Sequence, residues 1–200
     1  MSVEILAGAT LDDLASLPTT DPVSLILRHS EREHITGEDN VFLARLTPEG
    51  TAAAREFGCE LARLRQLGRV ISSPVSRCVD TAVAIAEGAE YSEKVRVDDR
   101  LSHLQMLEVW NALPDCCDFD SMPAGVASLI DLLLPQAGGQ ATLDVFVTHD
   151  TVVGALAGYL TGEPVQAEAI PRFLEGVFIW QDEENIHFWW RGKIATITRS

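Results

Sequence analysis

Short apolar segments alternate with longer amphipathic ones along most of the chain. Val23–Leu27 is an apolar run of strand length, and Leu143–Thr148 is a second, strongly β-prone one. Between them, Pro48–Leu67 carries apolar residues at helical spacing, with Thr47 as a favourable N-cap and Gly68 as a stop signal. The pattern therefore predicts strands and helices in alternation.

The remaining elements follow from the same pattern. Further helices are predicted at Leu11–Leu17 (with Thr10 in a capping box), Ser76–Glu87, Ala124–Leu134 and Val152–Leu160. Further strands are predicted at Val70–Ile71 and Val95–Asp98, and in a closing hairpin of Phe173–Trp180 and Ile186–Trp190. Residues 103–122 are irregular and rich in Pro, Asp and Cys, which predicts a loop or a small cap.

Strands that alternate with helices imply a mainly parallel sheet with helices on both faces. Two hundred residues suffice for one compact core and are too few for two comfortable domains. We therefore expect a single α/β domain spanning residues 1–200, built in three layers, with a small cap. In such sheets, ligands bind at the carboxyl ends of the strands.

The composition restricts the partners. The formal net charge of −15 argues against nucleic acid or an anionic membrane as a partner, since both require a basic surface. No apolar stretch is long enough to span a bilayer, and the first residues lack the pattern of a secretory signal. The four cysteines show no C-x-x-C spacing, which favours free thiols in a reducing compartment. We therefore expect a cytoplasmic protein.

Three apolar strands end in polar, ionisable clusters. The first strand runs into Arg28–His29, the second into Ser72–Ser73, and a late one into His149–Asp150. Because the carboxyl ends of parallel strands share one edge of the sheet, these clusters predict one common site. Arg32 and Arg77 lie close in sequence to the first two clusters and offer planar, forked donors suited to phosphate.

These clusters carry a family resemblance. The chain reads R-H-S-E-R from Arg28 to Arg32, S-S-P-V-S-R-C-V-D-T-A from Ser72 to Ala82, and H-D at His149–Asp150. In this order they resemble the histidine phosphatase superfamily, whose motifs are R-H-G, S-S-P-x-x-R-x-x-x-T-A and a second His after a late strand. The resemblance implies a phosphoglycerate mutase-like fold. Within the superfamily, the acid-phosphatase branch fits best, because its R-H-G-x-R-x-P and late H-D motifs match in register.

Two residues depart from the family pattern. Ser30 stands where the family has Gly, which affects any tight backbone approach that needs glycine's torsional freedom. His34 stands where the acid-phosphatase branch has Pro, and we expect it to change the rim of the pocket and so the substrate. Neither departure touches a residue that carries the expected chemistry.

The resemblance implies phosphomonoester hydrolysis through a phosphohistidine. His29 would attack phosphorus, and Asp150 would protonate the leaving group and then activate water, so that His29, His149 and Asp150 form the catalytic set. The phosphoryl oxygens would be bound by Arg28, Arg32, Arg77 and His149. The substrate would be a small phosphorylated molecule, and neither a metal nor an organic cofactor would be required.

Other interpretations remain open. One is a mutase-like phosphoryl transfer, and another is a phosphate-binding module without turnover. Asp150 could merely cap its helix, and His34, His103 and His187 read as surface or rim residues. Metalloprotease, serine hydrolase and nucleotide-binding motifs are absent, since H-x-x-E-H is missed by one residue and neither G-x-S-x-G nor a glycine-rich phosphate loop occurs.

Overall fold

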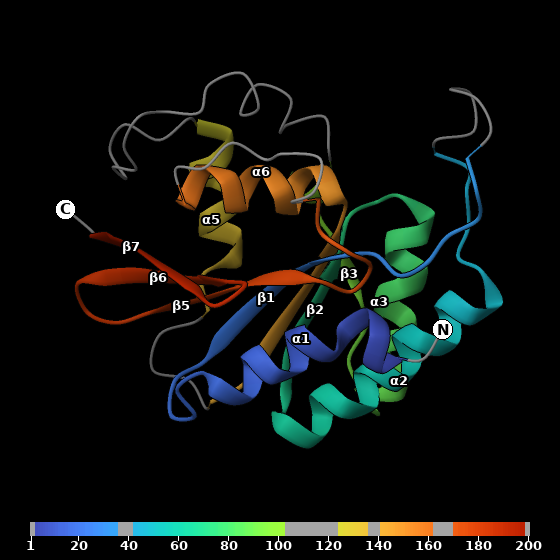
Figure 1. Ribbon diagram of the computed structural model, residues 1–200, viewed down its shortest axis with the longest axis horizontal. Helices are drawn as coiled ribbons and strands as arrows, with labels where there is room; N and C mark the ends of the chain where they lie inside the picture. The colour runs from blue at the N-terminus through green and yellow to red at the C-terminus, as the bar shows by residue number, and fades with distance from the viewer. Residues whose placement is uncertain (1–2, 36–41, 103–123, 136–140, 162–169, 199–200) are drawn as a thin grey trace.

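A computed structural model describes residues 3–35, 42–102, 124–135, 141–161 and 170–198 (Figure 1). The helices are α1 (Val3–Ser16), α2 (Pro48–Leu64), α3 (Ser76–Gly88), α5 (Ala124–Leu133) and α6 (Asp150–Thr161), with a 3₁₀ turn η2 (Asp99–Leu101). The strands are β1 (Val23–Arg28), β2 (Leu67–Ser72), β3 (Arg96–Val97), β4 (Leu143–Thr148), β5 (Gly176–Gln181), β6 (Asn185–Trp190) and β7 (Lys193–Thr198). Strands and helices alternate as the apolar pattern predicts.

One sheet joins all of these strands in the order β3-β2-β4-β1-β5-β6-β7. The four strands from β3 to β1 are parallel, whereas β5 runs antiparallel to β1 and continues into an antiparallel meander with β6 and β7. The predicted α/β class is confirmed. The closing hairpin is longer than predicted, because β7 adds a third strand after a turn through Arg191 and Gly192, both at positive φ.

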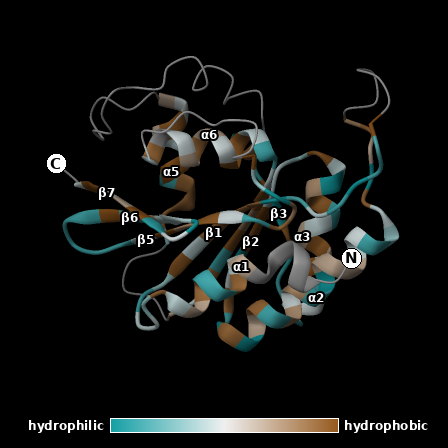
Figure 2. Ribbon diagram, in the orientation of Figure 1, coloured by the Kyte–Doolittle hydropathy of each residue, from teal (hydrophilic) through white to brown (hydrophobic). Residues whose placement is uncertain are grey.

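Helices cover both faces of the sheet, with α1, α2 and α3 on one side and α5 and α6 on the other (Figure 1). The layers follow from the alternation of side chains along the strands: Leu25 and Leu27 of β1 pack with α1–α3, and Ile26 packs with α5 and α6. All six residues of β4 are buried, which is typical of a central parallel strand. Hydrophobic positions make up much of the central strands (Figure 2). The apolar contacts on both faces of the sheet fix the positions of the strand ends.

The start of α2 is tied to the loop that follows β1. Thr47 caps the helix by accepting a hydrogen bond from the Gly50 amide at 2.9 Å, and Pro48 occupies the first turn, as the sequence predicts. A Cβ on Gly50 would lie 2.1 Å from the carbonyl oxygen of Glu31, so only glycine permits this approach. Helix α2 thereby supports the segment that carries the first polar cluster.

Two predicted helix boundaries are wrong. Helix α1 begins at Val3, so Thr10 lies inside it, where its hydroxyl donates to the carbonyl of Leu174 instead of capping. Helix α2 ends at Leu64, and Gly68 lies within strand β2 instead of terminating the helix. In both places a tertiary contact or a strand pairing outweighs the local signal.

The predicted cap at residues 103–122 lies outside the described residues. The assignment of one domain to residues 1–200 stays a prediction. Within the described part of the chain, no helix combines the length and apolarity that crossing a membrane requires.

Candidate active site

The three polar clusters meet at one edge of the sheet, because β2, β4 and β1 are neighbours in it. The backbone amide of His29 donates to the carbonyl of Thr148 at 2.9 Å, and that of Ser73 donates to the carbonyl of Val147 at 2.9 Å. These backbone hydrogen bonds hold the residues that follow β1 and β2 beside the end of β4. The clusters therefore lie at the carboxyl ends of neighbouring strands, as the sequence predicts.

A cavity of about 140 Å³ opens at this edge. It is lined by His29, Arg32, Ile35, Arg77, His149, Asp150 and Thr151. Five of the six predicted site residues are among them, and Arg28 is not. Two lining residues were not predicted from the sequence, Thr151 and Ile35. Thr151 could have been found from its position directly after His149–Asp150, whereas no sequence feature points to Ile35.

The imidazole of His29 is fixed in one tautomer. Its Nδ1 lies 2.7 Å from the carbonyl oxygen of Ser30, and since a carbonyl only accepts, Nδ1 carries the proton. Nε2 in turn accepts a hydrogen bond from Nε of Arg77 at 3.0 Å. The lone pair on Nε2 therefore faces a cation in the cavity, beside the place where an entering anion would be bound.

Burial keeps this imidazole neutral. His29 is 2% exposed, and desolvation lowers its pKa to about 2. The hydrogen bond to the Ser30 carbonyl acts in the opposite direction, and the charges of Arg77 and Arg28 lower the pKa further. A neutral, oriented imidazole is consequently present across the physiological pH range.

Arg77 bridges the two histidines. From the first turn of α3, its Nε reaches His29, and its NH2 group donates to Nδ1 of His149 at 3.1 Å. The side chain is 5% exposed, and burial lowers its pKa, although a guanidinium remains charged. One buried cation therefore faces both imidazoles, which lie 5.8 Å apart between ring centroids.

Arg28 holds Asp150 and the segment before β5. Its NH2 group lies 2.9 Å from Oδ2 of Asp150, and its NH1 donates to the carbonyl of Pro171 at 2.7 Å. The guanidinium also lies 4.3 Å from the ring centroid of Phe173, which lies 5.9 Å from the His29 ring. Arg28 thus contacts Asp150, which lines the cavity, but does not itself line it. Asp150 is part-exposed at the first turn of α6.

The two departures from the family pattern fit without disruption. Ser30 does not adopt the positive φ that would favour glycine, its amide donates to Thr81 Oγ1 at 3.0 Å, and its hydroxyl donates to the Gly50 carbonyl at 2.7 Å. Ser30 therefore tightens the contact between the His29 loop and α2. His34 is exposed and does not line the cavity, whereas its neighbour Ile35 does.

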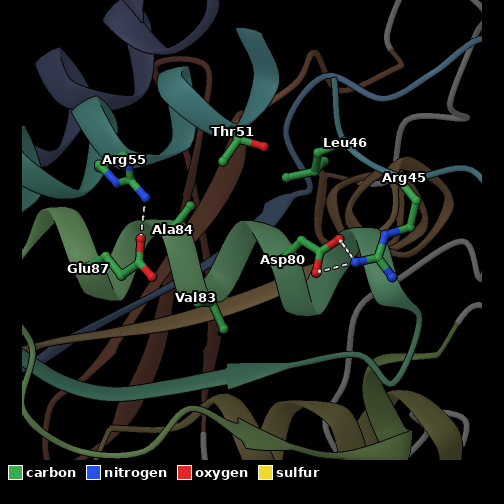
Figure 3. A pocket seen from close by; sticks show the side chains of 8 residues that line it. All are labelled: Arg45, Leu46, Thr51, Arg55, Asp80, Val83, Ala84 and Glu87. Atoms are coloured by element: carbon green, nitrogen blue, oxygen red, sulfur yellow. Dashed lines mark hydrogen bonds and ion pairs between the residues drawn. The ribbon is translucent and has the colours of Figure 1, made fainter. Parts of the chain in front are cut away.

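A larger cavity, of about 350 Å³, lies between α2 and α3 (Figure 3). Its arginines are already paired with carboxylates of α3: Arg45 with Asp80 at 3.0 Å, and Arg55 with Glu87. None of the predicted site residues lines it. The larger cavity thus contains no predicted site residue, whereas the smaller one is lined by five of them.

The remaining histidines lie outside the cavity lining or outside the described residues. His187 lies on β6, stacks on Trp180 and is paired with Asp182 at 2.7 Å, while His103 is not among the described residues. Within the described ranges, no three His, Cys, Asp or Glu side chains gather in a way that could hold a metal ion. In the cavity it is arginines that offer charge to an anion.

Comparisons with known proteins give a family match over part of the chain. The family model described as histidine phosphatase superfamily (branch 1) matches residues 25–115, which contain His29 and Arg77. That branch is the phosphoglycerate mutase-like one, and the match ends before His149–Asp150, so the acid-phosphatase assignment stays a prediction. No curated protein matches the chain.

Solved structures show the same fold. YhfR of Bacillus stearothermophilus has a TM-score of 0.56 at 17% identity, over 87% of this chain and 98% of its own. A mycobacterial glucosyl-3-phosphoglycerate phosphatase has a TM-score of 0.52 at 21% identity, over 90% of this chain and 99% of its own. The protein histidine phosphatase SixA has a TM-score of 0.51 at 19% identity, over 87% of this chain and 93% of its own. Over residues 25–115 the chain thus matches the model of the histidine phosphatase superfamily, and across most of its length it shares the fold of these solved structures.

Proposed function

We propose that the protein hydrolyses phosphate monoesters through a phosphohistidine at Nε2 of His29. The observation that carries the proposal is the state of that side chain: buried, neutral, protonated at Nδ1 and facing Arg77 through its lone pair. A structural core histidine has no need of a lone pair directed at a buried cation.

In the first step, Nε2 of His29 attacks phosphorus, and the bond between phosphorus and the ester oxygen breaks. Arg77 and Arg32 hold the phosphoryl oxygens on which negative charge is spread in the transition state. Arg28 adds to this cationic environment, and its buried Nε has no hydrogen-bond partner among the described residues. Fixed donors of this kind stabilise the transition state without reorganising.

Asp150 serves both halves of the reaction. It protonates the departing alkoxide and later takes a proton from the water that attacks the phosphohistidine. The carboxylate of Asp150 is held at the site by its ion pair with Arg28, at 2.9 Å.

The substrate class follows from the site and from the neighbours. A cavity of about 140 Å³ holds a phosphoryl group and leaves the rest of the ester near its mouth. Two of the neighbouring structures are phosphatases by name, one of glucosyl-3-phosphoglycerate and one of protein histidine. We propose a small phosphorylated substrate, no nucleic-acid or membrane partner, and a cytoplasmic reaction, in line with the net charge of −15 and the free thiols of Cys59 and Cys78.

The decisive experiment is to trap the intermediate. Wild-type protein is mixed with ³²P-labelled phosphoester, denatured without acid and digested, and the label is expected on His29, stable to base and labile to acid. The variant His29→Ala should take up no label and lose hydrolysis of an aryl phosphate. A folded His29→Ala that keeps a tenth of the activity would overturn the proposal.

The alternatives give different results in the same experiment. A phosphate-binding module would bind inorganic phosphate but never become labelled. A mutase-like transferase, which the branch 1 match favours, would become labelled but pass the label to a second hydroxyl compound faster than to water. Measuring free phosphate against transferred phosphate separates this activity from hydrolysis.

A further inference from the structure

Ser73 contacts the second histidine of the site on the side opposite to Arg77. Its hydroxyl oxygen lies 3.2 Å from Nε2 of His149, and both side chains are buried. A guanidinium only donates, so Nδ1 of His149 accepts from Arg77, and the ring proton lies on Nε2. The Nε2–H therefore donates to Ser73.

We propose that Ser73 is the positioning residue that, through its contact with Nε2, fixes the direction of the His149 ring for phosphoryl binding. The inference rests on the proposed phosphatase function and adds a role to a residue that does not line the cavity. Because Ser73 occupies Nε2, the Nδ1 edge of His149 is held toward Arg77. A phosphate monoester bound as its monoanion passes its proton to Nδ1, and the resulting N–H donates to a phosphoryl oxygen.

The surroundings of the ring support an orienting role for this hydroxyl. The Cys78 thiol lies 3.6 Å from Nε2 of His149, but burial raises its pKa to about 12, so it remains a neutral thiol. It also donates to the carbonyl of Thr148 at 3.5 Å. A hydroxyl oxygen is the stronger acceptor of the two, and it orients the ring as carboxylates and carbonyls do for metal-bound histidines.

The chain contains a matched control. Ser72, one residue earlier, is also fully buried, and its hydroxyl donates to the Ser73 carbonyl at 2.8 Å without contacting His149 in the described hydrogen bonds. Ser73→Ala and Ser72→Ala each delete one buried hydroxyl at the end of β2. Only the first removes an acceptor from His149, and Ser73→Thr restores it.

The experiment combines kinetics with ¹⁵N NMR of the histidine rings. We expect Ser73→Ala to lower kcat for an aryl phosphate by about tenfold, the scale of one neutral hydrogen bond, and to shift the Nε2 resonance of His149. Ser72→Ala should keep the wild-type kcat and the wild-type Nε2 resonance, and Ser73→Thr should recover both. Thermal unfolding of each variant checks that all are folded.

The outcomes separate the two proposals. If Ser73→Ala keeps the wild-type Nε2 resonance of His149 and the wild-type kcat, or if Ser72→Ala loses as much, Ser73 does not position His149. If the wild-type protein hydrolyses no phosphate ester, the proposed function fails. The Nε2 resonance alone then decides whether Ser73 orients the ring.

Discussion

The Nε–H of Arg77 donates to Nε2 of His29 across 3.0 Å, so a buried cation contacts the atom that we propose as the nucleophile. The same guanidinium also donates to Nδ1 of His149. In the proposed mechanism, a phosphoryl group that enters the cavity takes these donors over and is drawn toward the lone pair of His29. Binding of the anion would then also free the proposed nucleophile.

The first prediction is that Arg77→Lys lowers kcat/KM by about 10²- to 10³-fold, the usual loss for one preorganised donor to the transition state. Lysine keeps the charge but cannot reach His29 and His149 with two forked donors. Steady-state kinetics with an aryl phosphate measure the loss. The control Arg55→Lys changes an exposed arginine of α2 and should keep wild-type activity, so equal losses in both variants would remove Arg77 from the site.

A second prediction concerns stability and pH. Burial lowers the pKa of His29 to about 2, whereas an unfolded histidine titrates near 6.5. Between these values the unfolded chain binds a proton that the folded chain does not, so stability falls as the pH falls below 6.5. Wild-type protein should therefore lose about 2 kcal/mol more than His29→Gln between pH 7.5 and pH 5.

Urea unfolding at a series of pH values measures this difference. The control His34→Gln removes an exposed histidine and should keep the wild-type slope. If wild type and His29→Gln lose stability in parallel, His29 is not held neutral by the fold.

Much of this site could be predicted from the sequence, because the relevant signals are local. An apolar strand followed by Arg28–His29 or His149–Asp150 predicts both the element and the edge at which it ends. The convergence of the clusters needed the further fact that β2, β4 and β1 are neighbours, which depends on long-range pairing. The rule for parallel sheets predicted that the clusters share one edge of the sheet, but it did not predict which side chains contact one another there.

The contacts themselves could not be read from the chain. From its place in the motif, Arg28 is predicted to bind phosphate, and this stays a prediction. The motif did not indicate that its guanidinium contacts Asp150, Pro171 and Phe173. Strand β7 was missed because an Arg191–Gly192 turn is a weak hairpin signal beside the usual Asn-Gly. Such outcomes depend on which surfaces meet in three dimensions, and a one-dimensional pattern does not contain them.

A third prediction is that chelators leave the activity unchanged and that vanadate inhibits competitively. The cavity offers arginines to the phosphoryl oxygens, so charge neutralisation does not call for a divalent ion. Initial rates are measured after dialysis against EDTA and across a series of vanadate concentrations. A loss with EDTA that a divalent ion restores would contradict the cofactor-free mechanism.

The last prediction tests Asp150 as the proton donor. A general acid matters most when the leaving group is poor, because an alkoxide of high pKa does not depart without a proton. We expect Asp150→Asn to slow hydrolysis of alkyl phosphates about 10²- to 10⁴-fold more than that of nitrophenyl phosphate. Asparagine keeps an oxygen that can accept from the Thr151 amide, and the lost ion pair with Arg28 affects both substrates alike, so their ratio isolates the proton transfer.

The comparison requires that formation of the phosphohistidine limits both rates, which pre-steady-state bursts establish. If its breakdown were limiting, the role of Asp150 as base would slow both substrates equally and hide the difference. Once formation is shown to limit, equal losses on the two substrates would mean that Asp150 only caps its helix. Of the described carboxylates, Glu31 and Glu175 would then be the first to replace, since each lies within three residues of Arg28 or Phe173.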